Sequence, residues 1–216
     1  MKADRGRRSW LRDNGLTLTL AALFLASIAG QIVAGLAVEN GERLQHGAAP
    51  LALRQYLTSG GFLSSVFENW ESEFLQMWAY VMLTAYMFQR GSPESRDPDD
   101  ETPRPGEEPG RRRSVEGWLY AHSLGFALLA LFLASFVLHW LNSARAEADR
   151  ALEHGQPAPD LLAYLGDAQL WFESFQNWQS EFLSTAVLVV LGIFLRERLS
   201  PESKAVGDPD SKTGTD

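Results

Sequence analysis

Residues Leu16 to Val38 form a run of 23 residues without a charged side chain. About 20 apolar residues, rising 1.5 Å each in a helix, cross the ~30 Å hydrocarbon core of a bilayer. A helix of a bundle in water would carry a polar stripe along its whole length, and this run carries none. The run therefore predicts a membrane-spanning helix rather than part of a soluble four-helix bundle.

Three further apolar segments follow. Leu119 to Leu141 is of similar length, whereas Phe74 to Phe88 and Phe182 to Leu195 are shorter, and each short segment follows an apolar, aromatic stretch that lengthens it. We predict an all-α polytopic membrane protein with four transmembrane helices, at residues 16–38, 66–89, 119–141 and 174–196.

The chain repeats itself at a constant offset of 108 residues. LFLAS begins at Leu23 and again at Leu131, and FxNWxSEFL begins at Phe67 and again at Phe175. Such self-similarity at one offset is typical of a duplicated unit, here a helix, an outer loop and a second helix. Because two crossings return each unit to its starting side, we predict two tandem hairpins in parallel orientation.

Charge and composition complete the predicted organisation. The predicted outer loops hold 4 of the 19 basic residues and the other segments hold 15, which places both termini on the cytoplasmic side. The linker and the tail are rich in proline and charge and are predicted to be disordered. The segments are a basic N-terminus (1–14), repeat 1 (15–90) with outer loop 39–65, a linker (91–113), repeat 2 (114–199) with outer loop 142–169, and a tail (200–216).

Several classes of protein and of site are excluded. The net charge of −8 argues against a nucleic-acid partner, and the lack of cysteine excludes disulfides and thiolate sites. Arg7-Arg8 resembles a twin-arginine export signal, but the apolar run behind it is longer than the 7–15 residues of a signal peptide. No enzyme motif is present, so we predict no catalytic residue, metal or cofactor.

Each predicted outer loop contains a His-Gly pair, at His46 and at His154. The glycine would adopt the left-handed conformation that ends a helix, with the histidine in the turn. A metal or pH-sensing histidine is the alternative. Short interfacial helices are expected after the prolines, at Leu51 to Leu57 and Leu161 to Leu165.

A polar stripe on the second helix of each hairpin supplies the candidate site. At 100° per residue, Asn69 and Glu73 share a face that enters the membrane, and Asn177 and Glu181 repeat it. Counting residues from the helix ends places Gln31 and Glu73 at the same depth. In the second hairpin the equivalent residues are His139 and Glu181, a pair able to hold and pass a proton. The candidate ion-handling cluster is Asn69, Glu73, Gln31, Asn177, Glu181 and His139.

Three interpretations of this stripe stay open. The polar groups are hydrogen-bonding contacts between helices, or they lie at the water interface beside an aromatic belt of Trp70 and Trp178, or they line an ion or proton path. Small residues on the first helix repeat every four positions, as in close helix packing or simply as helix-forming alanine. This packing ridge consists of Ala22, Ala26, Gly30 and Ala34.

Four strings resemble an uncharacterised family of bacterial integral membrane proteins that carries a domain of unknown function. They are LRDNGL from Leu11, YLTSG from Tyr56, FENWESEFLQM from Phe67 and QRGSPES from Gln89. The resemblance covers nearly the whole chain and implies a multi-pass protein of the bacterial inner membrane. It brings no activity and no site residues.

The sequence therefore predicts a structural or interaction protein rather than an enzyme. Its partners are the lipid bilayer and either a second copy of the chain or another membrane protein. The alternative is a small channel or transporter for protons or cations that uses glutamate, asparagine and histidine side chains inside the membrane.

Overall fold

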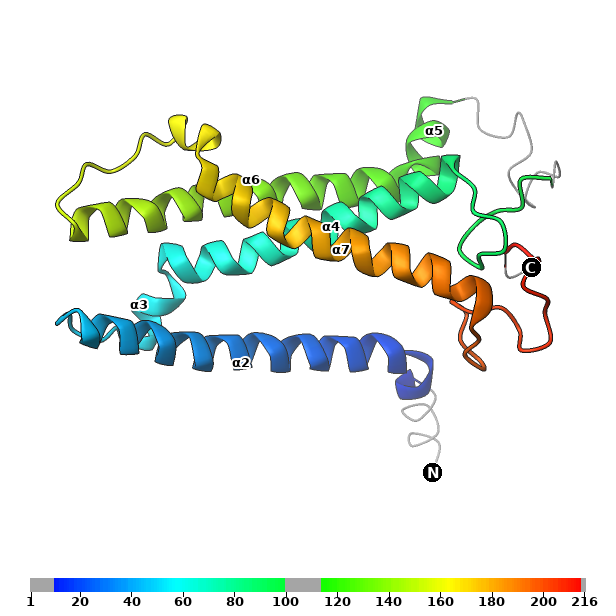
Figure 1. Cartoon of the computed structure of the whole chain (residues 1–216), viewed down its shortest axis with the longest axis horizontal. Helices are drawn as coiled ribbons and strands as arrows, with labels where there is room; N and C mark the ends of the chain where they lie inside the picture. The colour runs from blue at the N-terminus through cyan, green and yellow to red at the C-terminus, as the bar shows by residue number, and fades with distance from the viewer. Residues whose placement is uncertain (1–9, 100–113, 215–216) are drawn as a thin grey trace. The chain divides into compact units, whose positions relative to one another are not determined.

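The computed structural model describes residues 10–99 and 114–214, and every regular element in this part of the chain is a helix (Figure 1). The all-α class predicted from the sequence is confirmed for these residues. The elements in chain order are α2 (Gly15–Gln45), α3 (Leu53–Leu57), α4 (Gly60–Tyr86), α5 (Val115–Ala121), α6 (Ser123–Glu153), the 3-10 helix η1 (Ala163–Gly166) and α7 (Ala168–Phe194). Residues 1–9 and most of the predicted linker lie outside the described residues.

The four long helices begin and end at positions related by the offset of the sequence repeat. Helices α2 and α6 have 31 residues each, and α4 and α7 have 27 each. Both bounds of α6 lie 108 residues after those of α2, and both bounds of α7 lie 108 residues after those of α4. Helix length in the two halves therefore follows one pattern.

The His-Gly pairs end the two longest helices. His46 and His154 are the C-cap residues of α2 and α6, and the ring Nδ1 of each lies 2.8 Å from a carbonyl oxygen four residues earlier. Gly47 and Gly155 follow with φ angles of 74° and 69°, in the left-handed region that favours glycine. The predicted helix ends are confirmed, and both histidines are engaged by their own helices.

The chain divides into two units, residues 1–62 and residues 63–216, which are described separately. In the first unit, Asn40 ties the loop after α2 to that helix: its Oδ1 accepts from the Leu51 amide at 2.6 Å, and its Nδ2 donates to the Leu51 carbonyl at 3.1 Å. Tyr56 of α3 is buried against Gly35, where a Cβ atom would lie 2.0 Å from the tyrosine hydroxyl. Gly35 therefore allows α3 to approach α2 closely.

In the second unit, α4, α6 and α7 contact one another through polar side chains. Hydrogen bonds join α4 to α6, α6 to α7, and α4 to α7. A small apolar core of Ala144, Tyr164 and Leu170 packs η1 against α6 and α7. Asp167 begins α7 because its side chain accepts the Gln169 amide hydrogen at 2.8 Å, which caps the helix.

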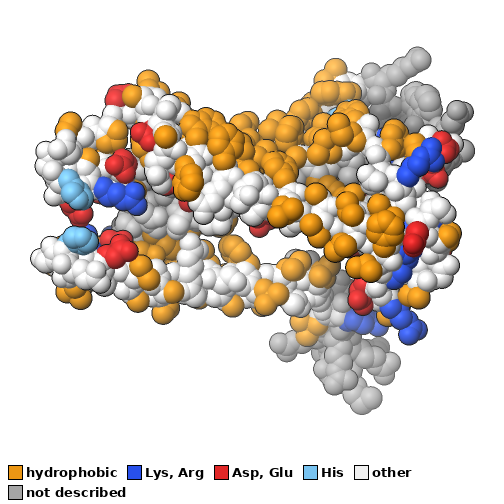
Figure 2. Space-filling view, in the orientation of Figure 1, with side chains coloured by type: hydrophobic (Ala, Val, Ile, Leu, Met, Phe, Trp, Pro, Cys, Tyr) orange, Lys and Arg blue, Asp and Glu red, His pale blue; other side chains and the backbone are white. Residues whose placement is uncertain are grey.

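Most of the large apolar side chains lie on the outside of the helices. Figure 2 shows hydrophobic side chains along the helices and charged ones toward their ends. Exposed apolar surface of this extent is not stable in water and marks a surface that faces lipid or protein. Three helices, α2, α6 and α7, are long and apolar enough to cross a membrane, which suggests a membrane location. Helix α4, with Glu68, Glu71 and Glu73, is not among them.

The segments after α4 and after α7 bind each other around one buried lysine. Lys204 is 1% exposed, and its Nζ donates to the carbonyl oxygens of Gly91, Asp210 and Lys212 at 2.6, 3.1 and 3.1 Å. The Gly91 amide donates to the Thr213 hydroxyl at 2.9 Å. Residues 200–214 thus form turns around the Lys204 ammonium group. Backbone carbonyl oxygens bind this group in place of water.

Glu94 makes the stability of this region depend on pH. Burial raises the pKa of the Glu94 carboxyl, and the neighbouring Glu202 raises it further against the opposing hydrogen bond from the Tyr80 hydroxyl, 2.6 Å away. A carboxyl whose pKa is higher in the folded than in the unfolded protein binds its proton more tightly when folded. The free energy of unfolding therefore falls as the pH rises from the ordinary value of 4.5 through the raised pKa of Glu94. We expect the unfolding temperature of the protein in detergent to fall over this range, and to fall less in Glu94→Gln. The exposed Glu116→Gln serves as the control; an unchanged pH slope in Glu94→Gln contradicts the prediction.

Candidate functional site

His139 of α6 lies at the centre of a buried polar cluster. Its Nδ1 lies 2.7 Å from Glu71 Oε2 of α4, and its Nε2 lies 3.1 Å from Glu173 Oε2 of α7. The side chains of His139 and Glu71 are fully buried, and that of Glu173 is 19% exposed. One imidazole thus joins three helices through two carboxylates.

Neutral donors extend the cluster on both sides. Trp178 Nε1 donates to Glu71 Oε1 at 2.9 Å, and Ser143 Oγ donates to Glu173 Oε2 at 2.8 Å. Because the Ser143 hydrogen goes to the carboxylate, the Tyr164 hydroxyl donates to Ser143 Oγ, 3.0 Å away. Burial raises the pKa of the Tyr164 hydroxyl, so this group keeps its hydrogen and remains a donor.

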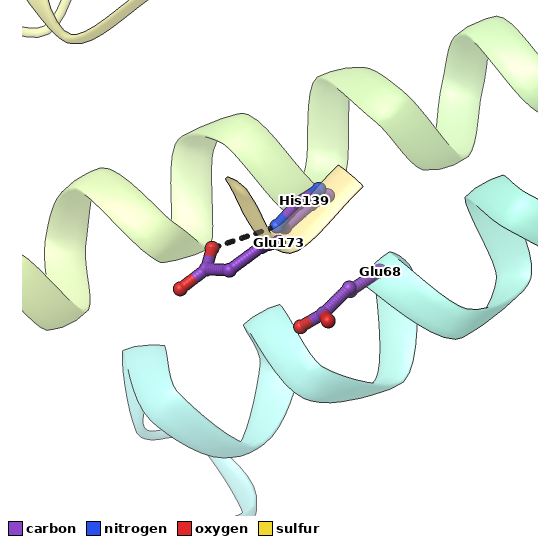
Figure 3. Close-up of side chains that lie close together, drawn as sticks. All are labelled: Glu68, His139 and Glu173. Carbon is purple, nitrogen blue, oxygen red and sulfur yellow. Dashed lines mark hydrogen bonds and ion pairs between the residues drawn. The ribbon is translucent and has the colours of Figure 1, made fainter. Parts of the chain in front are cut away.

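A third carboxylate, Glu68 of α4, approaches the same imidazole. Figure 3 shows Glu68, His139 and Glu173 converging from three helices. One oxygen or nitrogen atom from each of these side chains lies within 4.8 Å of the other two. Asn177 of α7 donates to Glu68 Oε1, so this carboxylate is also fixed by a neutral donor.

The cluster holds more negative than positive groups. Both ring nitrogens of His139 face carboxylate oxygens, so both carry hydrogen when Glu71 and Glu173 are ionised. Even as an imidazolium, His139 offsets one of three carboxylates. Within the described part of the chain, no lysine or arginine forms an ion pair with Glu68, Glu71 or Glu173. Burying this imbalance is costly, and protons or a bound cation would relieve it.

The structure brings together two of the six candidate residues. His139 and Asn177 belong to the cluster, while Asn69 and Glu73 are exposed on another face of α4. Glu181 forms no hydrogen bond to His139, whose ring nitrogens face Glu71 and Glu173 instead; the hypothesis of a His139–Glu181 pair is therefore replaced. Gln31 lies in α2 and belongs to the first unit.

The two tryptophans of the proposed aromatic belt and the four residues of the packing ridge differ in exposure and contacts. Trp178 is half-buried and donates to Glu71, whereas Trp70 is 36% exposed, so the two tryptophans do not have equivalent surroundings. The four residues of the packing ridge, Ala22, Ala26, Gly30 and Ala34, are all exposed.

Glu68, Glu71 and Glu173 were not among the candidate site residues. A signal for them exists in the repeat: it is the set of positions where the two halves differ. The counterparts of His139, Glu68, Glu71 and Glu173 at the offset of 108 are Gln31, Gln176, Gln179 and Ser65. Each of these four residues thus has a neutral polar counterpart, so the other half of the repeat lacks the charged set.

An all-helical fold, apolar helix exteriors and a buried carboxylate–imidazole cluster define a helical protein suited to a membrane. The chain belongs to the family described as "Domain of unknown function (DUF6766)", whose model matches residues 7–215. The resemblance to a family of unknown function is therefore confirmed. No curated protein and no solved structure matches the chain.

Proposed function

We propose that this protein is a cation-handling protein of the bacterial inner membrane and that the cluster around His139 is where the cation is held. The observation that carries the proposal is the charge imbalance: Glu68, Glu71 and Glu173 surround one imidazole. Hydrogen bonds between neutral amides and hydroxyls would join the helices at lower cost. Carboxylates inside a membrane are costly, and they commonly mark ion or proton pathways.

We propose that α4 is the fourth crossing and that the chain is two tandem parallel hairpins with cytoplasmic termini. The matching bounds of α2 with α6 and of α4 with α7 support this arrangement. The distribution of basic residues supports the orientation. Two of the three glutamates of α4 are compatible with a crossing: Glu68 binds α7 and Glu71 binds α6, so neither is left to lipid.

Further polar groups lie between α4 and α7 on the other side of the cluster. Gln76 Nε2 donates to Thr185 Oγ1 at 2.5 Å, and the Tyr80 hydroxyl donates to Glu94. These residues line a cavity of about 460 Å³ that extends to the loop after α4. The lining begins at Gln76, five residues after Glu71, and does not include the cluster itself, so a cation that enters from the cytoplasmic side would pass between α4 and α7 beyond Gln76 to reach the cluster.

A structural or interaction role is the second candidate. The exposed ridge of Ala22, Ala26, Gly30 and Ala34 favours it, because small residues allow close approach of a second helix. A homodimer or another membrane protein would supply that helix. In neither role is the protein an enzyme.

Flux measurements separate the two roles. The full chain is reconstituted in liposomes that contain dyes for protons, monovalent cations and divalent cations, and a membrane potential drives uptake. We expect uptake above that of empty liposomes, and a loss of about tenfold or more in the double variant Glu71→Gln, Glu173→Gln, since both carboxylates are buried ligands or partners of His139. Wild-type uptake equal to that of empty liposomes overturns cation handling and leaves the structural role.

A matched control exists on the same helices. Glu73→Gln with Glu181→Gln makes the same chemical change on α4 and α7 but outside the cluster. Uptake in this control should stay within about twofold of wild type, as for residues away from a site. Equal loss in both double variants would show that the cluster is not where the cation is held.

A further inference from the structure

We propose that the cation is a divalent transition-metal ion and that Glu68, His139 and Glu173 are its protein ligands. This inference rests on the cation-handling proposal and names the class of ion. The three ligands come from α4, α6 and α7, and Figure 3 shows their side chains pointing toward one another. A bound ion would therefore join all three long helices of the second unit.

The spacing of the donor atoms fits a metal ion. The candidate ligand atoms lie within 4.8 Å of one another, and His139 Nε2 is 3.1 Å from Glu173 Oε2. Ligands at 2.0–2.2 Å from a tetrahedral ion lie about 3.4 Å apart, so only small rotations of the glutamate side chains are required. Nε2 is the ligand atom because Nδ1 of the same ring is bound to Glu71.

Each proposed ligand is held by a further polar group. Glu71 accepts the hydrogen of His139 Nδ1, so a metal ion that displaces the hydrogen from Nε2 binds the lone pair of that nitrogen while the ring stays oriented. Asn177 donates to Glu68, and Gln169 Nε2 donates to Glu173 Oε1 at 2.8 Å. A carboxylate behind a metal-binding histidine is the usual arrangement in metalloproteins. Supported ligands of this kind distinguish a metal site from a chance cluster of acids.

The charge and chemistry of the donors select the ion. A divalent cation offsets two of the negative charges that the protein itself leaves uncompensated. One imidazole with two carboxylates suits Zn²⁺, Mn²⁺ or Fe²⁺, whereas Mg²⁺ and Ca²⁺ prefer oxygen ligands alone. The chain has no cysteine, so ions that require thiolate are excluded. Ser174 follows Glu173 in the sequence and is 1% exposed, and its hydroxyl has no hydrogen-bond partner in the described part of the chain.

Binding to the purified full chain in detergent, after removal of any affinity tag, tests the inference. Titration calorimetry with Zn²⁺ and Mn²⁺ should show one ion per chain, with Mg²⁺ bound far more weakly. Glu71→Gln should weaken binding by about 10–100-fold through the loss of the group behind His139, and Glu68→Gln by at least as much. The triple variant His46→Gln, His122→Gln, His154→Gln removes every other histidine and should bind as wild type does.

A measurement on the unmodified protein covers the case in which a variant fails to fold. X-ray absorption at the zinc edge of the wild-type complex should show one imidazole nitrogen and oxygen ligands. The absence of an imidazole, or loss of binding in the triple variant, overturns the proposed ligand set.

Two further outcomes separate this inference from the proposal on which it rests. Cluster-dependent uptake of K⁺, Na⁺ or protons without binding of any divalent ion overturns the metal site and leaves cation handling. Binding of Zn²⁺ or Mn²⁺ with the expected ligands but no uptake into liposomes supports the metal site and overturns transport.

Discussion

Replacement of His139 with leucine should lower the free energy of unfolding by about 3–5 kcal/mol, the cost typical of removing one partner of a buried ion pair. The imidazole is the group that Glu71 and Glu173 share, and both hydrogen bonds are lost together. Glu71 has no access to water, so its carboxylate would stay buried with only Trp178 as a donor. Unfolding in mixed micelles with increasing SDS measures the effect.

The control and the neighbouring variants make this expectation specific. His154→Leu changes the same residue type at the exposed end of α6 and should cost about 1 kcal/mol or less, because a C-cap contributes little. In a double-mutant cycle, Glu71→Gln should cost less in the His139→Leu background than in wild type. Additive costs would contradict a direct Glu71–His139 interaction.

Replacement of Gly91 with alanine should release the segment after α7. Gly91 has a φ angle of 80°, which costs a residue with a Cβ about 1–2 kcal/mol. The added Cβ would also lie 2.7 Å from the Asp210 carbonyl oxygen, a backbone atom that cannot move alone. Both backbone groups of Gly91 bind this segment, through Thr213 and Lys204. The chain must therefore shift away from Lys204.

Limited proteolysis and hydrogen exchange of residues 204–214 measure this release. Gly207→Ala provides the control, because a Cβ at Gly207 meets nothing within 4 Å and its backbone has no positive φ. Exchange should be faster by about tenfold or more in Gly91→Ala, in line with a local loss of roughly 1.4 kcal/mol, and unchanged in Gly207→Ala. Equal protection in both variants would show that the contact with Gly91 does not hold this segment.

Local signals in the sequence were sufficient for the apolar character of three long helices and for the ends of α2 and α6, but not for the break at His122 that separates α5 from α6. The apolar runs predict α2, α6 and α7 as membrane-spanning, and the His-Gly pairs predict where α2 and α6 stop. Each of these features lies within one continuous stretch of sequence, so no knowledge of the rest of the chain is needed.

The cluster depends on contacts between helices that are far apart in the sequence. Helical periodicity finds a polar face on α4 at Asn69 and Glu73, but Glu68 and Glu71 form another, and periodicity alone does not say which face is buried. The buried face is the one that meets a partner, and the partner of Glu71 is His139, 68 residues later in the sequence. The burial of Lys204 could not be predicted for a similar reason. A lysine in a polar, proline-containing segment gives no sign that carbonyl groups will surround it.

The origin of the cluster in three helices has a consequence for how the chain is made. Ribosomes add about 5–20 residues per second, so Glu71 leaves the ribosome roughly 3–14 s before His139, 68 residues later. Until then, Glu71 lacks the imidazole that it binds in the folded protein. In the proposed arrangement, with α4 as the fourth crossing, stable insertion of α4 is expected to wait for α6 and α7, because a ribosome that stalls before Ser123 leaves α4 without the helices that bind Glu68 and Glu71.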